Sequence, residues 1–141
     1  WLVHPASLGD RMGDLSGINN TGATSFVQHA AATAIRDGEE FVTEMVERCR
    51  RGRDLVHQRW GGMDRIKLAS PKAAFYAFPQ IEGLKDDLEF AKYLVREHRV
   101  GLAPGSAFGP DNDGFLRLCF AKSEEQLSAA MDRIEAGLKN L

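Results

Sequence analysis

Apolar residues recur at helical spacing through the first 60 residues of the chain. They predict helices over residues 6–15, 25–36 and 39–60. The stretch 16–22 is rich in serine, asparagine and glycine, which favour turns, so we expect the first helix not to continue through it. The apolar start of the chain, residues 1–3, predicts the end of a strand.

After Gly61 and Gly62 the pattern changes to short strands that alternate with helices. We predict strands over residues 66–68, 73–78, 100–103 and 115–120, and helices over residues 86–98 and 123–138. The last helix begins with a capping box, in which Ser123 is the cap residue and Gln126 follows three positions later. The expected fold class is therefore α/β (mixed α+β), with N-terminal helices followed by a small mixed sheet that helices cover.

The three longest apolar stripes predict which helix faces meet the core. The stripe of the helix over residues 39–60 consists of Phe41, Met45, Cys49, Val56 and Trp60. The helix over residues 86–98 has Leu88, Ala91, Leu94 and Val95, and the terminal helix has Leu127, Met131, Ile134 and Leu138.

Composition places the chain among soluble globular domains. It has 141 residues, of which 43% are hydrophobic and 27% charged, and the net charge of −2 indicates neither a nucleic acid nor a membrane surface as partner. No apolar run reaches the ~18 residues that a bilayer span needs. Cys49 and Cys119 are too isolated for a disulfide framework or a zinc site, which favours a reducing cytoplasm. Because the chain begins at Trp1, we expect its amino terminus to be cut.

Arg117 is the residue most suggestive of binding chemistry. It lies in the middle of an apolar strand, on the same face as Phe115 and Cys119. A guanidinium in such a setting needs an anionic partner, because burying an unpaired charge is costly. Its planar fork can bind a carboxylate ligand through two parallel hydrogen bonds. An internal ion pair with one of the 20 acidic residues is the alternative.

The loop before this strand, residues 104–110, contains two glycines and Phe108. Glycines allow a ligand to approach the backbone closely, and Phe108 could cover an apolar part of that ligand. An ordinary turn with one buried aromatic side chain explains the same residues.

Other patterns give no site. A basic run consists of Arg48, Arg50, Arg51 and Arg53, and we interpret it as the solvated face of a helix rather than as a binding patch. The nucleotide-binding and zinc-binding motifs GxGxxG, GxxxxGK[ST], HExxH and CxxC are absent, and the four histidines are scattered, so no metal site is predicted.

Several segments together resemble the pyridoxal-phosphate (PLP) dependent aminotransferases of fold type I, the aspartate aminotransferase-like class I and II enzymes. The matching segments are residues 1–5, 24–31, 71–79, 100–109 and 114–121, in the family's order. The third is similar to the family's P-x-G-A-F-Y-x-F-P strand, with Ala73 where glycine is common. Each motif is modest alone, but their order over the whole chain is specific.

The resemblance implies a domain division and a set of site residues. Residues 1–37 would be a remnant of the large PLP-binding domain with its connecting helix, and residues 38–141 the C-terminal small domain. Arg117 would bind the substrate α-carboxylate, and Phe108, Ser106 and Gly105 of the lid loop would also line the substrate site. No lysine of the chain lies in the family's cofactor-lysine context, so no cofactor-binding or catalytic residue is assigned.

The resemblance also implies an activity and partners for the intact parent. It would be a cytoplasmic homodimer that uses PLP to transfer an amino group between an amino acid and a 2-oxo acid. The chain alone, without the cofactor lysine, is expected to be inactive. Two alternatives share the fold: an aminotransferase-like sensor domain of a transcription regulator, and a PLP-dependent lyase.

Overall fold

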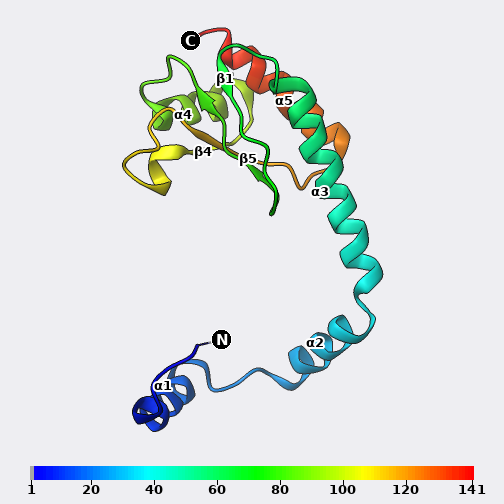
Figure 1. The fold of residues 1–141 in the computed structure, drawn as a ribbon, viewed down its shortest axis with the longest axis vertical. Helices are drawn as coiled ribbons and strands as arrows, with labels where there is room; N and C mark the ends of the chain where they lie inside the picture. The colour runs from blue at the N-terminus through cyan, green and yellow to red at the C-terminus, as the bar shows by residue number, and fades with distance from the viewer. Residues whose placement is uncertain (1) are drawn as a thin grey trace. The chain divides into compact units, whose positions relative to one another are not determined.

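The computed structural model describes residues 2–141, which group into two units that divide between Val42 and Thr43 (Figure 1). The strand end predicted for residues 1–3 falls partly on Trp1, which lies outside the described residues. Leu2 and Val3 form no strand, because a strand requires a hydrogen-bonded neighbour and no described segment pairs with them.

The first unit is helical. A short 3₁₀ helix, η1 (Ala6–Leu8), leads into α1 (Gly9–Asn20), which is followed by α2 (Ser25–Asp37). Our prediction that the first helix stops before the turn-rich stretch is wrong. Serine, asparagine and glycine are weak helix formers but not forbidden ones, and the break is delayed until Thr21, whose φ of 49° is left-handed.

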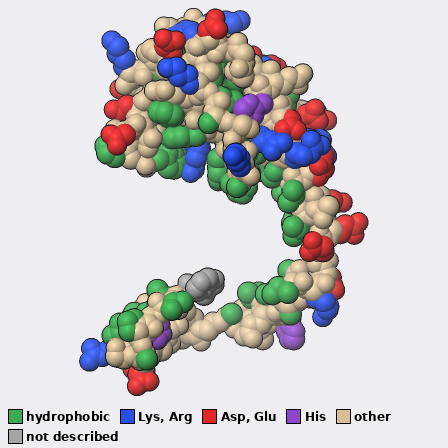
Figure 2. All heavy atoms as spheres, viewed as in Figure 1, with side chains coloured by type: hydrophobic (Ala, Val, Ile, Leu, Met, Phe, Trp, Pro, Cys, Tyr) green, Lys and Arg blue, Asp and Glu red, His purple; other side chains and the backbone are tan. Residues whose placement is uncertain are grey.

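The helices of the first unit bury none of their large apolar side chains. In α1, Leu15 is 49% exposed, and in α2 Phe26 and Ile35 are 73% and 88% exposed. Figure 2 shows hydrophobic side chains, in green, on the surface of both helices. The hydrophobic core of the chain therefore belongs to the second unit.

The longest helix is α3 (Glu39–Trp60), with the bounds that the apolar pattern predicted. Its stripe is only half confirmed: Val56 and Trp60 are 1% exposed, whereas Phe41 near the start is 66% exposed. No helix among residues 2–141 is both long enough and apolar enough to cross a bilayer.

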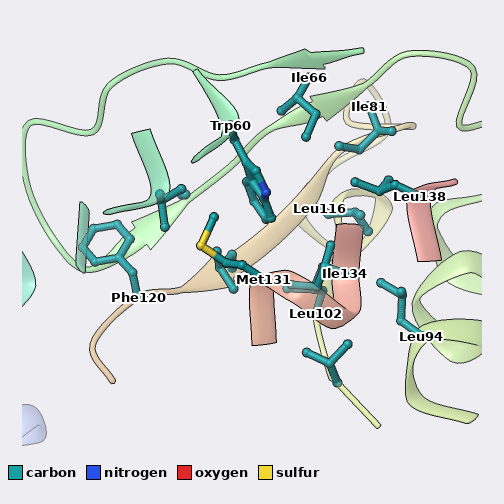
Figure 3. Close-up of a cluster of buried hydrophobic side chains, with 14 of the residues drawn as sticks. Trp60, Ile66, Ile81, Leu94, Leu102, Leu116, Phe120, Met131, Ile134 and Leu138 are labelled. Carbon is teal, nitrogen blue, oxygen red and sulfur yellow. The ribbon is translucent and has the colours of Figure 1, made fainter. Parts of the chain in front are cut away.

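The core of the second unit forms where the end of α3, the terminal helix α5 (Glu124–Leu138) and the strands meet (Figure 3). Trp60 lies beside Met131 of α5, with Phe120 on the same side of the cluster. Gly52 allows α3 to approach the chain closely, since a Cβ there would collide with the carbonyl oxygen of Phe120. All four stripe residues predicted for the terminal helix are buried, which confirms that stripe.

Polar contacts also join α3 to α5. The Arg59 guanidinium donates to Glu135 and to Asp132, each at 2.7 Å. The indole N–H of Trp60 donates to the Glu135 carboxylate at 3.1 Å. The hydrogen bond from Arg59 to Glu135 is the main cause that raises the pKa of Arg59 above its ordinary value.

The strands form two small antiparallel sheets. One pairs β1 (Ile66–Lys67) with β3 (Gln80–Ile81), and the other has the order β2 (Tyr76–Ala77), β5 (Leu116–Cys119), β4 (Ala103–Pro104). The fold is thus the mixed α/β class that the sequence predicted.

Most predicted strands are shorter in the structure. The strand expected over residues 73–78 is reduced to Tyr76–Ala77, because Ala74 takes a left-handed φ of 61° that ends extended backbone. The strand β3 was not predicted, since two residues after Pro79 are too few to show an alternating pattern.

Both helices of the second half begin at a side-chain cap. Asp86 accepts a hydrogen bond from the Glu89 amide at 2.9 Å at the start of α4 (Asp87–His98). Ser123 accepts one from the Gln126 amide at 3.3 Å at the start of α5, as the capping box predicted.

The stripe predicted for α4 is partly wrong. Ala91 and Leu94 are buried, but Leu88 and Val95 are 47% and 52% exposed. The buried face runs instead through Phe90, which lies three and four residues from its buried neighbours along the helix. Because α4 begins with the buried Asp87, its inward face is rotated away from Leu88.

Candidate functional site

The candidate site is the open face of the three-stranded sheet, centred on Arg117. Leu116 and Leu118 are 1% and 4% exposed and face the core, so the alternation of the strand turns Arg117 to the other face. Its guanidinium carbon lies 4.4 Å from the ring centre of Tyr76 and 4.2 Å from that of Phe108. Both separations are those of cation–π contacts.

Arg117 has no internal anionic partner within the described residues, 2–141: none of the hydrogen bonds or ion pairs found there involves its guanidinium. The alternative that the sequence left open, an ion pair with one of the chain's own acidic residues, is therefore not formed. Neither ring offers a carboxylate oxygen to the N–H groups of the guanidinium. The arrangement leaves the planar fork able to bind an anion.

Aromatic side chains surround this position. The Phe78 and Phe115 rings stack with centres 5.0 Å apart, and Phe78 meets Phe108 edge-on at 5.9 Å. Tyr76 reaches Arg117 because β2 pairs with β5 in the register that sets Tyr76 opposite Cys119. Sequence reasoning missed Tyr76 as a site residue, since cross-strand register is not visible in a strand taken alone.

The loop predicted before the arginine strand contains a short 3₁₀ helix, η2 (Gly105–Phe108). The Gly105 amide donates to the Phe115 carbonyl at 2.8 Å, and a Cβ on Gly105 would collide with the Asn112 carbonyl oxygen. This glycine therefore permits close packing of the chain against itself. Phe108, 43% exposed, extends from the end of η2 over Arg117.

Ser106 is bound to a residue that the sequence did not single out. Its amide and its hydroxyl both donate to the Asp87 carboxylate, at 2.8 Å and 2.7 Å. The Ser106 hydroxyl proton is therefore used within the chain. The only signal for Asp87 was its place in the acidic first turn of a helix, which the helix dipole already explains.

The four predicted site residues do not stand in equivalent positions. Phe108 and Arg117 are in contact, whereas Gly105 and Ser106 support the turn that carries Phe108. All six lysines of the chain, Lys67, Lys72, Lys85, Lys92, Lys122 and Lys139, are exposed. None has the buried setting that would mark it as a covalent cofactor ligand, so no residue of this chain is assigned to hold one.

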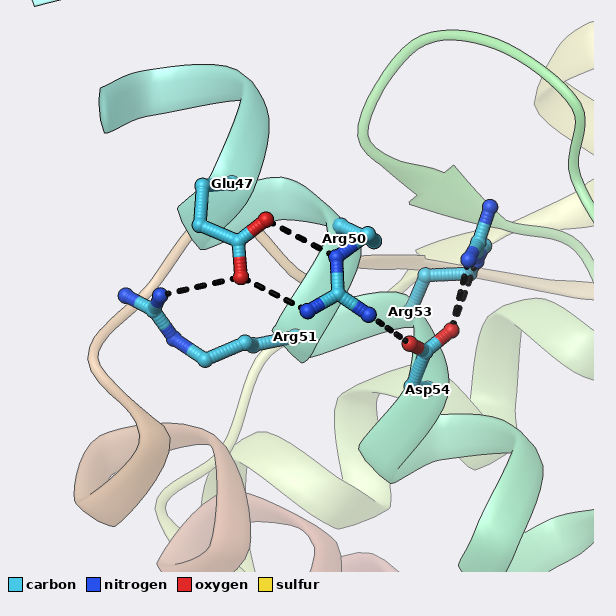
Figure 4. A network of polar contacts seen from close by, with 5 residues as sticks. All are labelled: Glu47, Arg50, Arg51, Arg53 and Asp54. Atoms are coloured by element: carbon cyan, nitrogen blue, oxygen red, sulfur yellow. Dashed lines mark hydrogen bonds and ion pairs between the residues drawn. The ribbon is translucent and has the colours of Figure 1, made fainter. Parts of the chain in front are cut away.

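Three arginines of the basic run on α3 form a surface network with Glu47 and Asp54 (Figure 4), whereas Arg48 donates to the Lys122 carbonyl oxygen at 3.3 Å. Arg50 pairs with Glu47 at 2.7 Å and with Asp54 at 3.0 Å, and the side chains are about half exposed. The hydrogen bond from Arg50 is the main reason that the pKa of Glu47 lies below its ordinary value. These pairs within one helix agree with the solvated-face interpretation.

Comparison with known proteins gives consistent matches along the chain. Residues 1–134 match the family model for aminotransferases of class I and II. The aromatic-amino-acid aminotransferase 2 of Thermococcus litoralis is 38% identical, over 99% of this chain and 36% of that protein. The aspartate aminotransferase of Pyrococcus abyssi is 37% identical over the same shares. The chain thus spans about a third of the length of the curated relatives it matches.

A solved structure agrees with these sequence matches. The crystal structure of the aromatic aminotransferase from Pyrococcus horikoshii has a TM-score of 0.84 with this chain at 35% identity. The match covers 98% of this chain and 37% of that one.

Proposed function

Because this chain belongs to the family of class I and II aminotransferases, we propose that it is the C-terminal part of an aminotransferase that transfers an amino group between an amino acid and a 2-oxo acid. The observation that carries the proposal is the half-buried Arg117, which contacts two aromatic rings and has no internal anion among residues 2–141. The relatives' names favour a transferase over a lyase or a sensor domain of a transcription regulator.

The proposed domain division follows the family. Residues 1–37 would come from the large domain and its connecting helix, and residues 38–141 would form the small domain. The exposed apolar side chains of α1 and α2, such as Phe26 and Ile35, support this division, because helices of this kind need another part of a protein to cover them.

The proposed role of Arg117 is to bind the α-carboxylate of the substrate. Two parallel N–H···O bonds would fix both the position and the plane of that carboxylate. Tyr76 and Phe108 limit the rotation of the guanidinium, so less orientational freedom is lost when the substrate binds. PLP, bound in the intact parent, would supply the electron sink for the α-carbon. Binding energy at Arg117 would orient that carbon for reaction.

The other site residues receive separate roles. Phe108 would cover the bound carboxylate and exclude water from its hydrogen bonds with Arg117. Gly105 would allow the close packing of η2 that brings Phe108 to the site. Ser106, whose amide and hydroxyl both donate to Asp87, would line the substrate site and stabilise the turn that carries Phe108.

The first test is substitution of Arg117 in the intact parent. Arg117→Lys should keep PLP bound but lose one charged hydrogen bond to the carboxylate, which lowers kcat/KM by roughly ten- to hundredfold. Arg117→Ala should lower kcat/KM further and weaken dicarboxylate inhibitors. Steady-state kinetics and PLP titration measure the two effects separately.

Arg59→Lys is the matched control, because Arg59 is partly buried and forms ion pairs within the fold. It should lower the melting temperature and leave kcat/KM unchanged. If Arg117→Lys behaves in the same way as this control, Arg117 has only a structural role and the proposed substrate site is wrong.

We further propose that the intact parent is a cytoplasmic homodimer. Its support is the resemblance of the chain to this family, in which the segment matching residues 19–25 would lie close to the dimer interface, together with the exposed apolar side chains of α2. Sedimentation of the intact parent should give a dimer at micromolar concentration. A monomer under those conditions would contradict this assignment.

A further inference from the structure

Asp87 is the only buried acidic or basic side chain within residues 2–141, with 4% of its surface exposed. A buried carboxylate is stable only where donors replace the water it has lost. Ser106 supplies two donors, its amide at 2.8 Å and its hydroxyl at 2.7 Å. Both come from η2, which follows α4 in the chain by several residues, so the buried charge joins two separate elements.

These hydrogen bonds fasten the turn that carries Phe108. Gly105 is tied to Phe115 through its amide, and Ser106 is tied to Asp87. Two residues further on, Phe108 contacts Arg117 at 4.2 Å and meets Phe78 edge-on. The position of the Phe108 ring over the Arg117 guanidinium therefore depends on η2, whose first two residues, Gly105 and Ser106, are both held by hydrogen bonds.

We propose that Asp87 is a positioning residue for the substrate site: it holds η2 in place so that Phe108 stays against Arg117 before the substrate arrives. The inference rests on the proposed function, because it presupposes that Arg117 binds the substrate carboxylate and that the position of Phe108 affects this binding. Its consequence is that η2 moves together with α4 and β5 as one body. The loop is then not an independent lid that closes on its own.

The experiment compares variants of the intact parent by hydrogen–deuterium exchange of residues 105–108 and by kcat/KM. Asp87→Ala removes both acceptors. Asp87→Asn keeps two contacts, because its oxygen can accept from the Ser106 amide while its NH₂ donates to the Ser106 hydroxyl. The control is Asp86→Ala, since Asp86 caps the same helix through the Glu89 amide. This hydrogen bond of the Asp86 side chain stays within the first turn of α4 and does not reach η2.

We expect Asp87→Ala to speed amide exchange in η2 about tenfold or more. Displacement of Phe108 should lower kcat/KM by about ten- to hundredfold with PLP affinity unchanged. Asp87→Asn should retain most of the slow amide exchange in η2 and most of kcat/KM. Asp86→Ala should lower only the melting temperature. If Asp87→Ala does not fold, Ser106→Ala loses only the hydroxyl contact and should give an intermediate change in both.

Two results would overturn the inference: unchanged exchange in η2 when the contacts are removed, or faster exchange with unchanged kcat/KM. Failure of the proposed function is a different result, because the unsubstituted parent would then transaminate no amino acid. The exchange measurement would still show whether Asp87 holds η2.

Discussion

At the scale of single residues, the candidate site depends on which side chains surround the charged guanidinium of Arg117. Arg117 is half-buried, yet its neighbours in the described chain are rings rather than carboxylates. Aromatic faces attract a guanidinium weakly and do not neutralise it, so the charge remains available to a ligand. An internal ion pair would have stabilised the same side chain, but its N–H groups would then no longer be available to a ligand.

Ala74 provides a test of backbone strain next to this site. Its φ of 61° lies in the left-handed region, where a Cβ costs about 1–2 kcal/mol. Ala74→Gly should therefore be neutral or stabilising by up to about 1 kcal/mol, after the entropy cost of glycine. Ala74→Val should destabilise by at least about 1 kcal/mol, because a branched side chain fits this region poorly. Urea unfolding measures both free energies.

Ala73 is the control for Ala74. It occupies the position where the family commonly has glycine, but it is exposed and its φ is not positive. Ala73→Val should therefore change the unfolding free energy by less than about 0.5 kcal/mol. Equal effects of valine at the two positions would show that φ at Ala74 is not strained.

At the scale of elements, close packing of α3 against the end of β5 determines how the core closes. Gly52 is buried, and a Cβ there would meet the Phe120 carbonyl oxygen and lie 3.5 Å from a methyl carbon of Leu127. Gly52→Ala should destabilise the fold by about 1–3 kcal/mol through overpacking, although alanine is the better helix former. Chemical denaturation measures the change.

Gly13 in α1 is the matched helical glycine, since a Cβ there meets nothing within 4 Å. Gly13→Ala should raise helicity by far-UV circular dichroism and stabilise α1 by up to about 1 kcal/mol. A stabilising Gly52→Ala would mean that α3 can move away from Phe120 at little cost, and would argue against the packing described.

At the scale of the whole molecule, the proposed function gives this chain a substrate-binding residue, Arg117, and predicts that the cofactor lysine lies outside the chain. Every lysine is exposed, and none lies in the motif where the family's cofactor lysine is expected. We therefore expect the 141-residue chain to form no stoichiometric covalent adduct with PLP and to have no aminotransferase activity. Absorbance titration with PLP tests this, with each lysine substituted in turn. A stoichiometric band that disappears on substitution of one lysine would contradict the prediction.

Local patterns were enough to predict the helices and the approximate positions of most strands, although α1 extends to Asn20 and β3 was missed. The bounds of α3, the stripe and capping box of α5, and the isolated charge in β5 all follow from spacing over a few residues. The order of the family motifs added the fold class and the family. These properties are encoded locally because helix period, capping and strand alternation involve neighbours in the sequence.

Contacts between distant segments decided the rest. The register of β2 against β5 brings Tyr76 to Arg117, and the approach of η2 to α4 buries Asp87 beneath Ser106. The same packing rotates α4 so that Phe90, not Leu88, faces inward. The sequence pattern alone predicted the helices and the approximate positions of most strands, and it predicted that Arg117 needs an anionic partner. Only the tertiary structure decided which partners it has, because those partners come from separate elements whose distances and register no local pattern contains.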